Sequence, residues 1–320
     1  MEVDDTVYRE NTIEKTVIKE LIQTEPVQRL KDIQQAGPQK YFIDKEPVTR
    51  YEHSIGVFLL LKKFDASLEE QIAGLLHDVP HTAFSHLVDF VFQTEKHDYH
   101  DDFLDEIVYD SEIPEILERH GIDVEEVLDE SNFKLLERDM PSLCADRIDY
   151  FLRDLNIHKE KDVQHFVDAL TVHDNEFMLS DKEIAEEYAL EFIGMDRDAW
   201  ASPKEVAVNE LFAKVIRRAF EIDLLTEEEL FENDEYVYSK IAESDDEEIN
   251  EVLDTLKSDF DVKLSDEDPD VESVTKARFV DPHVVSEGEV MRVTDYSEEL
   301  KQEIEEHKDK VRSGYSIKLV

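Results

Sequence analysis

Residues 75–86 have the sequence Leu75-Leu76-His77-Asp78-Val79-Pro80-His81-Thr82-Ala83-Phe84-Ser85-His86. Three histidines and an aspartate lie within ten residues, directly after an apolar run. Buried polar groups at this density need partners, because each unpaired group costs about 1–3 kcal/mol. A metal ion is one such partner, and an extended hydrogen-bond network is the alternative. The stretch alone leaves both interpretations open.

The residues before this stretch predict a helix that ends inside it. Ser67 and Glu70 form a capping-box pattern at its start. Its apolar face is formed by Leu68, Ile72, Leu75 and Leu76. Because Pro80 disfavours helical geometry in the preceding residue, we expect the helix to end near Asp78 and His81 to begin the next element. This differs from a zinc-protease pair, whose two histidines are four residues apart on one continuous helix.

Two further helices carry chemically useful side chains. Thr49 and Glu52 form another capping-box pattern, which places His53 near the start of a helix that runs through Leu61. A later helix begins at Pro141-Ser142, with an apolar stripe of Ile148, Phe151, Leu152 and Leu155. The opposite stripe consists of Asp146, Asp149, Tyr150 and Arg153. Such a polar stripe is either a solvated face or part of a site, and the spacing does not decide between them.

The other segments predict a mostly α protein. We expect helices within 12–36, from His81 through Phe92, and at 183–195, 203–223, 224–256 and 297–310, with strands at 41–43, 278–282, 290–293 and 316–320. The strands near the end indicate a small C-terminal sheet within an α+β region. We divide the chain into a core of residues 1–180 and an extension of residues 181–320, packed on that core.

The net charge of −47 is extreme, with 82 Asp and Glu residues against 35 Lys and Arg. Self-repulsion of this size opposes folding in dilute salt. At molar salt the screening length falls to about 3 Å, and the same surface is then tolerated. The composition therefore predicts a halophilic protein from a salt-accumulating organism, of haloarchaeal type.

Composition also excludes several classes of protein. Binding to duplex nucleic acid needs a basic surface that this sequence lacks. Cys144 is the single cysteine, which rules out an internal disulfide framework and fits a reducing compartment. No signal segment follows Met1, and no apolar run approaches 18 residues. We therefore expect a cytoplasmic protein without membrane contact, which forms a homo-oligomer through its apolar C-terminal helices.

Four residues from three helices form a ligand set: His53, His77 with Asp78, and Asp146. Two imidazoles and two carboxylates suit a divalent metal such as manganese, iron, zinc, nickel or magnesium. A histidine, a later His-Asp doublet and a distant aspartate together resemble the pattern of the HD-domain phosphohydrolases. This resemblance implies an HD-type helical core.

Three longer stretches resemble the deoxynucleoside triphosphate (dNTP) triphosphohydrolase branch of that family, which includes the enzyme that joins an HD domain to a SAM domain. The stretches are 50–57, 77–86 and 146–154, with the sequences RYEHSIGV, HDVPHTAFSH and DRIDYFLRD. The likeness covers about half of the chain, roughly residues 17–160. A Gly-Pro pair is common in that branch where this chain has Thr82-Ala83.

The resemblance also implies roles for the surrounding residues. Arg50 and Arg147 would face the triphosphate, Tyr150 and Asp154 the sugar, and Gln35 with Ala36 the base. His81, His86 and His100 match catalytic histidines, although His97 competes with His100 for that place. Asp89 would orient one of these imidazoles. The small anionic substrate would be a nucleotide.

Residue chemistry agrees with phosphate ester hydrolysis. The reaction needs an activated water, neutralised phosphate oxygens and a proton donor for the leaving oxygen, here a protonated His86 or His81. We expect dNTP hydrolysis to deoxynucleoside and tripolyphosphate. The alternatives are another phosphoester, such as a nucleoside monophosphate or an alarmone, and a non-catalytic interaction module stabilised by metal.

Overall fold

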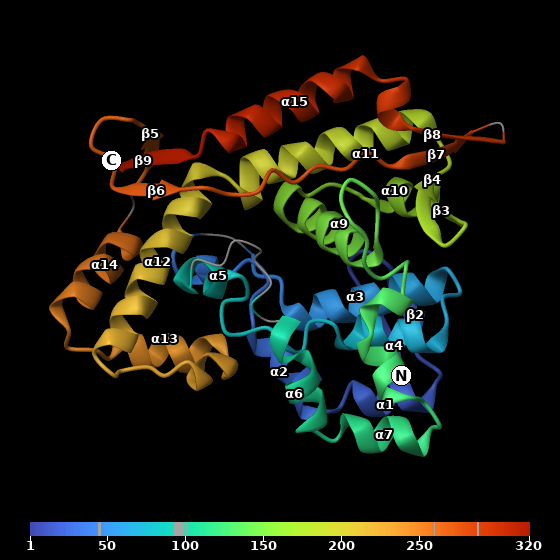
Figure 1. Cartoon of the computed structure of the whole chain (residues 1–320), viewed down its shortest axis with the longest axis horizontal. Coiled ribbons are helices and arrows are strands. Elements are labelled where there is room, and N and C mark those ends of the chain that lie inside the picture. Colours follow the sequence, from blue (N-terminus) through green and yellow to red (C-terminus); the bar gives the residue numbers. More distant parts are fainter. Residues whose placement is uncertain (44–45, 93–98, 100, 259, 287) are drawn as a thin grey trace.

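The computed structural model describes residues 1–43, 46–92, 99, 101–258, 260–286 and 288–320. It is mostly helical, with small sheets near both ends of the chain (Figure 1). This confirms the predicted class, a helical core with a C-terminal α+β region. None of its helices, within the described residues, is long and apolar enough to cross a membrane.

Helices dominate the order of elements along the chain. The α-helices are α1 (Thr16–Leu21), α2 (Glu25–Arg29), α3 (Arg50–Lys63), α4 (Leu68–Leu76), α5 (Leu87–Phe92), α6 (Leu104–Tyr109), α7 (Ile113–Arg119), α8 (Val124–Leu128), α9 (Ala145–Lys159), α10 (Gln164–Ala169), α11 (Lys182–Met195), α12 (Pro203–Glu221), α13 (Asp234–Ala242), α14 (Glu247–Lys257) and α15 (Glu298–Arg312). Short 3-10 turns are η1 (Leu30–Asp32), η2 (Pro38–Tyr41), η3 (Asp101–Phe103), η4 (Glu130–Asn132), η6 (Glu228–Phe231) and η7 (Val293–Asp295), whereas η5 (Asp196–Trp200) is a π-helical turn. The strands are β1 (Glu2–Asp5), β2 (Arg9–Thr12), β3 (Leu170–His173), β4 (Glu176–Leu179), β5 (Val262–Leu264), β6 (Val271–Ser273), β7 (His283–Ser286), β8 (Glu289–Arg292) and β9 (Tyr315–Leu319).

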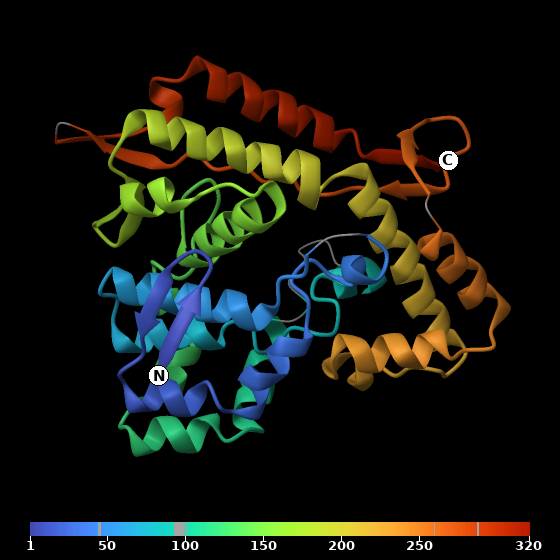
Figure 2. The ribbon, with the colours of Figure 1, turned by 180° about the vertical axis from the view of Figure 1, so that it is seen from behind.

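Three small sheets join these strands. β1 and β2 form an antiparallel hairpin, and β5, β9 and β6 form an antiparallel sheet with β9 in the centre. The third sheet has the order β3-β4-β7-β8. Its central pair is parallel, with Leu179 opposite Val284, so the C-terminal segment closes onto the strand that follows α10 and β3. The sheets lie at the periphery and leave the centre of the fold to helices (Figures 1 and 2).

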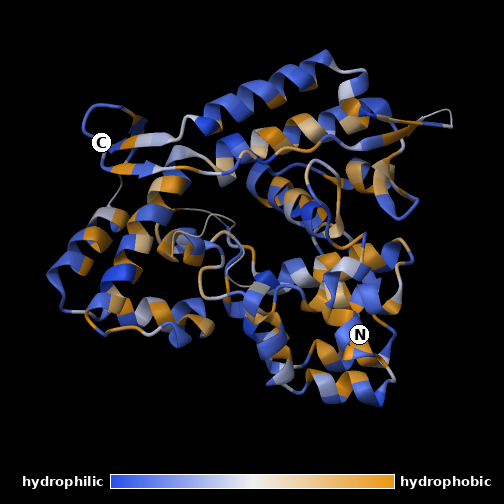
Figure 3. Ribbon diagram, in the orientation of Figure 1, coloured by the Kyte–Doolittle hydropathy of each residue, from blue (hydrophilic) through white to orange (hydrophobic). Residues whose placement is uncertain are grey.

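Apolar side chains gather in two clusters. The first joins α1, α3, α4, α9, α11 and α15, and the second joins α5, α12, α13, α14 and β9. Hydrophobic residues line the inward faces of these helices, while α15 is mostly hydrophilic along its length (Figure 3). Both clusters take members from either side of residue 180, so the two halves of the chain share their cores.

Some local predictions were wrong. Residues 41–43 are not a strand, because Gly37 has a φ of 85° and Pro38 begins η2 after it. Residues 278–282 are extended chain without ladder pairing. Two of their backbone groups bond elsewhere, since the Arg278 N–H donates to Asp196 Oδ2 and the Asp281 N–H donates to the Pro141 carbonyl. The hairpin of β1 and β2 was not predicted, because its strands are short and polar.

Candidate metal centre

Helix α3 supplies the first candidate ligand. Thr49 Oγ1 accepts the Glu52 N–H at 3.2 Å, and Glu52 Oε2 accepts the Thr49 N–H at 2.8 Å, so the predicted capping box is confirmed. The cap fixes the start of the helix one turn before His53, which is fully buried. The imidazole is therefore held on a rigid helix start in the interior.

The second pair of candidate ligands lies where α4 ends. His77 is the C-cap of α4, as the position of Pro80 predicted. His77 Nδ1 lies 2.9 Å from the Gly74 carbonyl oxygen, so this nitrogen carries the proton and Nε2 points away from α4. Such a backbone contact fixes the tautomer that binds a metal through Nε2. Asp78 follows, 3% exposed.

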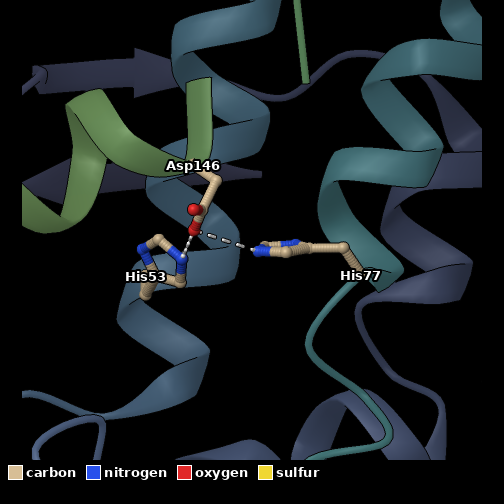
Figure 4. A group of neighbouring side chains, drawn as sticks. All are labelled: His53, His77 and Asp146. Carbon is tan, nitrogen blue, oxygen red and sulfur yellow. Dashed lines mark hydrogen bonds and ion pairs between the residues drawn. The ribbon is translucent and has the colours of Figure 1, made fainter. Parts of the chain in front are cut away.

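Asp146 completes the group from the first turn of α9. Asp146 Oδ1 lies 2.9 Å from His53 Nε2 and 3.7 Å from His77 Nε2 (Figure 4). Asp78 lies close to both rings, with 3.5 Å from its Oδ1 to His77 Nε2 and 3.8 Å from its Oδ2 to His53 Nε2. The structure thus brings all four predicted ligands together.

The geometry fits a divalent cation. Ligand atoms that share one ion at about 2.1 Å lie about 3–3.5 Å apart, close to these separations. His77 Nε2 is buried and makes no hydrogen bond, although it faces the carboxylate of Asp146. An unsatisfied buried nitrogen among carboxylates is better explained as a metal ligand than as a member of a completed hydrogen-bond network.

Charges within the group are strongly coupled. Burial alone would lower the pKa of His53, but hydrogen bonds to Asp146 and Asp149 outweigh it and raise this pKa to about 10. Burial would raise the pKa of Asp78, yet the positive charges of Arg50 and His77 hold it well below its usual range. A cation that binds here therefore meets ionised carboxylates and must displace a proton from His53.

A second buried carboxylate, that of Asp149, contacts the other ring nitrogen of His53. Asp149 Oδ2 accepts a hydrogen bond from His53 Nδ1 at 2.8 Å, and Asp149 itself is fully buried. Arg153 donates to both oxygens of Asp149 and to Asp5. Space for this network exists only because residue 56 is glycine: a Cβ there would lie 2.0 Å from Asp149 Oδ1. The polar stripe of α9 is therefore part of the site and not a solvated face.

A second acidic group, formed by Glu137, Cys144 and Asp146, also has metal-ligand spacing. Arg147 contacts it directly, with its Nη1 3.1 Å from Cys144 Sγ and its Nη2 3.3 Å from Glu137 Oε1. Burial raises the pKa of the Cys144 thiol well above its usual range, so the thiol stays protonated and is a poor metal ligand. The His53 group is the better metal site.

The predicted catalytic histidines flank the ligands. His81 Nε2 lies 3.1 Å from Asp78 Oδ1, which places His81 against a candidate ligand carboxylate. His86 Nδ1 lies 3.2 Å from Asp89 Oδ2, the contact expected of an orienting aspartate. Burial, together with the charges of Arg50 and Arg278, lowers the pKa of His86 although Asp89 opposes this. His100 and His97 lie outside the described residues.

The backbone between these histidines is strained. Phe84 and Ser85 have φ values of 61° and 52°, which cost about 1–2 kcal/mol per residue. Asp234 of α13 holds this turn: its Oδ1 accepts the Phe84 N–H at 2.7 Å, and its Oδ2 accepts the Gln34 N–H at 3.0 Å. A fully buried aspartate from the C-terminal half thus shapes the site, and no sequence motif indicated it.

The two predicted triphosphate arginines differ in placement. Arg50 Nη1 donates to both oxygens of Asp78 at 3.0 Å, so it lies at the candidate metal centre. Arg147 instead turns toward its own segment and donates to the Arg138 and Ser142 carbonyls. With these contacts its guanidinium supports the loop before α9 and does not reach across the ligands.

The predicted nucleoside contacts lie around the same helix. Tyr150 and Asp154 follow Asp146 at successive helical turns, and Trp200 of η5 contacts both. Its ring meets that of Tyr150 edge-on at 5.2 Å, and its Nε1 donates to Asp154 Oδ2 at 2.7 Å. Gln35 has a buried side-chain oxygen without a hydrogen-bond partner. No sequence signal pointed to Trp200, which stands 46 residues beyond Asp154 in the chain.

Comparison with known proteins agrees with this geometry. The HD domain family matches residues 50–154, which begin at Arg50 and include all four candidate ligands. The chain is 30% identical to the metal-dependent phosphohydrolase cns2 of Cordyceps militaris, over 90% of this chain and 86% of that protein. The chain belongs to the HD-domain family of metal-dependent phosphohydrolases. Dependence on a divalent metal, predicted from the ligand set, is thereby confirmed.

Other relatives extend the comparison. The uncharacterized protein YdhJ of Bacillus subtilis is 38% identical over all of this chain and 99% of its own. A deoxynucleoside triphosphate triphosphohydrolase homologue of Dictyostelium discoideum is 37% identical, over 22% of this chain and 16% of that one. A solved phosphohydrolase structure from Bacteroides thetaiotaomicron superposes with a TM-score of 0.71 at 15% identity, over 93% of this chain and 95% of that one. This last likeness concerns the fold alone.

Proposed function

We propose that this HD phosphohydrolase acts on nucleotides, and that dNTPs are its substrates, cleaved to deoxynucleoside and tripolyphosphate. The observation that carries the proposal is the group of His53, His77 and Asp146, in which the buried Nε2 of His77 faces carboxylates without a hydrogen bond. With Asp78, these residues would hold a divalent cation, which supplies an acidified water and neutralises phosphate oxygens. Arg50 adds a fixed positive charge beside them.

In the proposed reaction, the oxygen of water forms a bond to the α-phosphorus and releases one proton to solvent, and the bond from that phosphorus to the 5′-oxygen breaks. The leaving oxygen receives a proton from His86 or His81. The pKa of His86 is lowered by burial and by the charges of Arg50 and Arg278, which favours the neutral imidazole. A bound phosphate would raise that pKa through its negative charge, so His86 becomes a proton donor once substrate is present. Asp89 orients the ring for this transfer.

The nucleoside would lie along α9 and the segment before α3. Tyr150 and Asp154 would contact the sugar, because both lie on the helix face that carries Asp146. Gln35 offers a buried acceptor oxygen without a partner, which suits a base or sugar donor. The name of the Dictyostelium relative, a dNTP triphosphohydrolase homologue, supports this choice of substrate.

Product identification tests the proposal. Purified protein in high salt with excess Mn²⁺ is incubated with dNTPs, NTPs, nucleoside monophosphates and bis(p-nitrophenyl) phosphate. Phosphorus NMR and chromatography then identify the products. We expect tripolyphosphate and deoxynucleoside from dNTPs. The His86→Ala variant should retain its metal and lose activity about 10²- to 10⁴-fold, as expected for a proton-transfer group.

Other outcomes separate the alternatives. Pyrophosphate or orthophosphate as the first product from dNTPs would contradict the triphosphohydrolase proposal and leave the phosphohydrolase family unaffected. Turnover of monophosphates alone would favour a nucleotidase.

We further infer a cytoplasmic protein, on the basis of its single buried Cys144, and a homo-oligomer. Size-exclusion chromatography with light scattering tests the oligomeric state.

A further inference from the structure

The segment between β6 and β7, in the C-terminal half of the chain, carries the cationic side chain of Arg278. It runs from one end of the fold to the other (Figures 1 and 2) and meets η5 where α11 ends. Arg278 is anchored there twice. Its backbone N–H donates to Asp196 Oδ2 at 2.8 Å, and its Nη1 lies 3.6 Å from Asp196 Oδ1. Its guanidinium is thus held beside Asp196, while 37% of the side chain remains exposed to solvent.

Asp196, which holds Arg278, is a carboxylate in the interior of the protein. Asp196 is fully buried, and its Oδ2 also accepts a hydrogen bond from His307 Nε2 of α15 at 2.7 Å. Asp196 opens the π-helical turn η5, and such turns occur frequently at functional sites. Trp200 ends that same turn and contacts Tyr150 and Asp154. Arg278 and the proposed sugar contacts are therefore held by one short element.

The positive charge of Arg278 affects the pKa values of His86 and Tyr150. Burial lowers the pKa of His86, and the positive charge of Arg278 contributes to this. Burial raises the pKa of Tyr150, and Arg278 is among the charges that oppose the rise. The contacts agree for Tyr150: Asp196, which pairs with Arg278, opens the turn that Trp200 ends, and Trp200 packs edge-on against Tyr150. Arg147 is less accessible: its side chain is 9% exposed and contacts the Glu137 loop, whereas that of Arg278 is 37% exposed.

We propose that Arg278 is a substrate-binding residue that takes phosphate oxygens of the substrate, in the place that the sequence assigned to Arg147. A guanidinium presents a planar fork that matches two oxygens of a phosphate. In a chain with a net charge of −47, an anionic substrate needs such local cations in addition to metal. This inference rests on the proposed phosphohydrolase activity and adds the C-terminal half to the substrate site.

The test measures ligand binding directly. Protein loaded with Mn²⁺ is titrated calorimetrically with tripolyphosphate, added as its Mn²⁺ complex in a fixed excess of Mn²⁺. Loss of one charge-assisted hydrogen bond corresponds to about a ten- to hundredfold rise in Kd, which we expect for Arg278→Ala. Arg278→Lys should recover part of the affinity. The KM for the preferred nucleotide should rise with Kd, and the KM for the monoanion bis(p-nitrophenyl) phosphate should rise less.

Arg197→Ala is the matched control. Arg197 stands next to Asp196 on the same turn, is exposed, and forms ion pairs with Asp198 and Glu303. Its removal changes the net charge equally and should leave Kd within about twofold. If Arg278→Ala, folded and metal-loaded, binds tripolyphosphate as the wild type does, the inference is wrong. Failure of the wild type to hydrolyse dNTPs would overturn the proposed substrate alone, because the binding titration would still decide the role of Arg278.

Discussion

At the scale of single residues, the site depends on how His53 is held between two carboxylates. Asp146 faces Nε2, and Asp149 accepts a hydrogen bond from Nδ1. An aspartate behind a ligating histidine fixes the ring and raises its basicity. The motif resemblance predicted Asp146 from the sequence. Asp149 was visible only as one member of a polar stripe, because its burial depends on the close approach of α3 at Gly56.

Asp149→Asn should weaken metal binding about 10- to 100-fold, since the neutral amide no longer supports the imidazole through its charge. The substitution keeps the shape of the side chain, and Arg153 keeps Asp5 as a partner. Isothermal titration with Mn²⁺ at about pH 7.5 measures the effect. Asp168→Asn is the control, because Asp168 is exposed on α10. An unchanged Kd in Asp149→Asn would show that the carboxylate has only a structural role.

At the scale of elements, the C-terminal half shapes the catalytic segment through α13 and η6. Asp234 holds Phe84 and Gln34, and the Ala83 N–H donates to the Leu230 carbonyl at 2.7 Å. The sequence predicted the helices on both sides of this contact, because their apolar periodicity is a local property. It could not predict the contact itself, which joins residues 150 positions apart through one carboxylate.

Asp234 should give the protein a characteristic pH dependence. Burial raises the pKa of Asp234 to about 6, although the Phe84 N–H and Lys40 oppose this. In the unfolded chain the pKa is about 3.9. Between these values the folded chain retains a proton that the unfolded chain has lost, so the free energy of unfolding falls as pH rises from about 4 to about 6.

Asp234→Asn removes this titration. We expect the free energy of unfolding of the wild type, relative to that variant, to fall by up to about 3 kcal/mol between about pH 4 and pH 7. Urea unfolding at constant high salt measures the difference. The exposed Asp245 provides the control variant Asp245→Asn, which should follow the wild type. A difference that is constant with pH would contradict the raised pKa.

At the scale of the whole molecule, charge and shared cores govern stability. We propose that the chain is halophilic, because a net charge of −47 is tolerated only where it is screened. The melting temperature should rise between low salt and about 2 M KCl. A melting temperature that is flat or falls over this range would contradict the proposal.

The division at residue 180 stays a prediction, since both apolar clusters contain residues from either side of it.

Anomalous diffraction from a crystal grown with Mn²⁺ would show directly whether the metal is held by the four candidate ligands His53, His77, Asp78 and Asp146. We expect one strong anomalous peak about 2.0–2.3 Å from His53 Nε2, His77 Nε2 and one carboxylate oxygen each of Asp78 and Asp146. An anomalous peak at Glu137 and Cys144 with none among the histidines, or no bound metal at all, would contradict this assignment of the metal site.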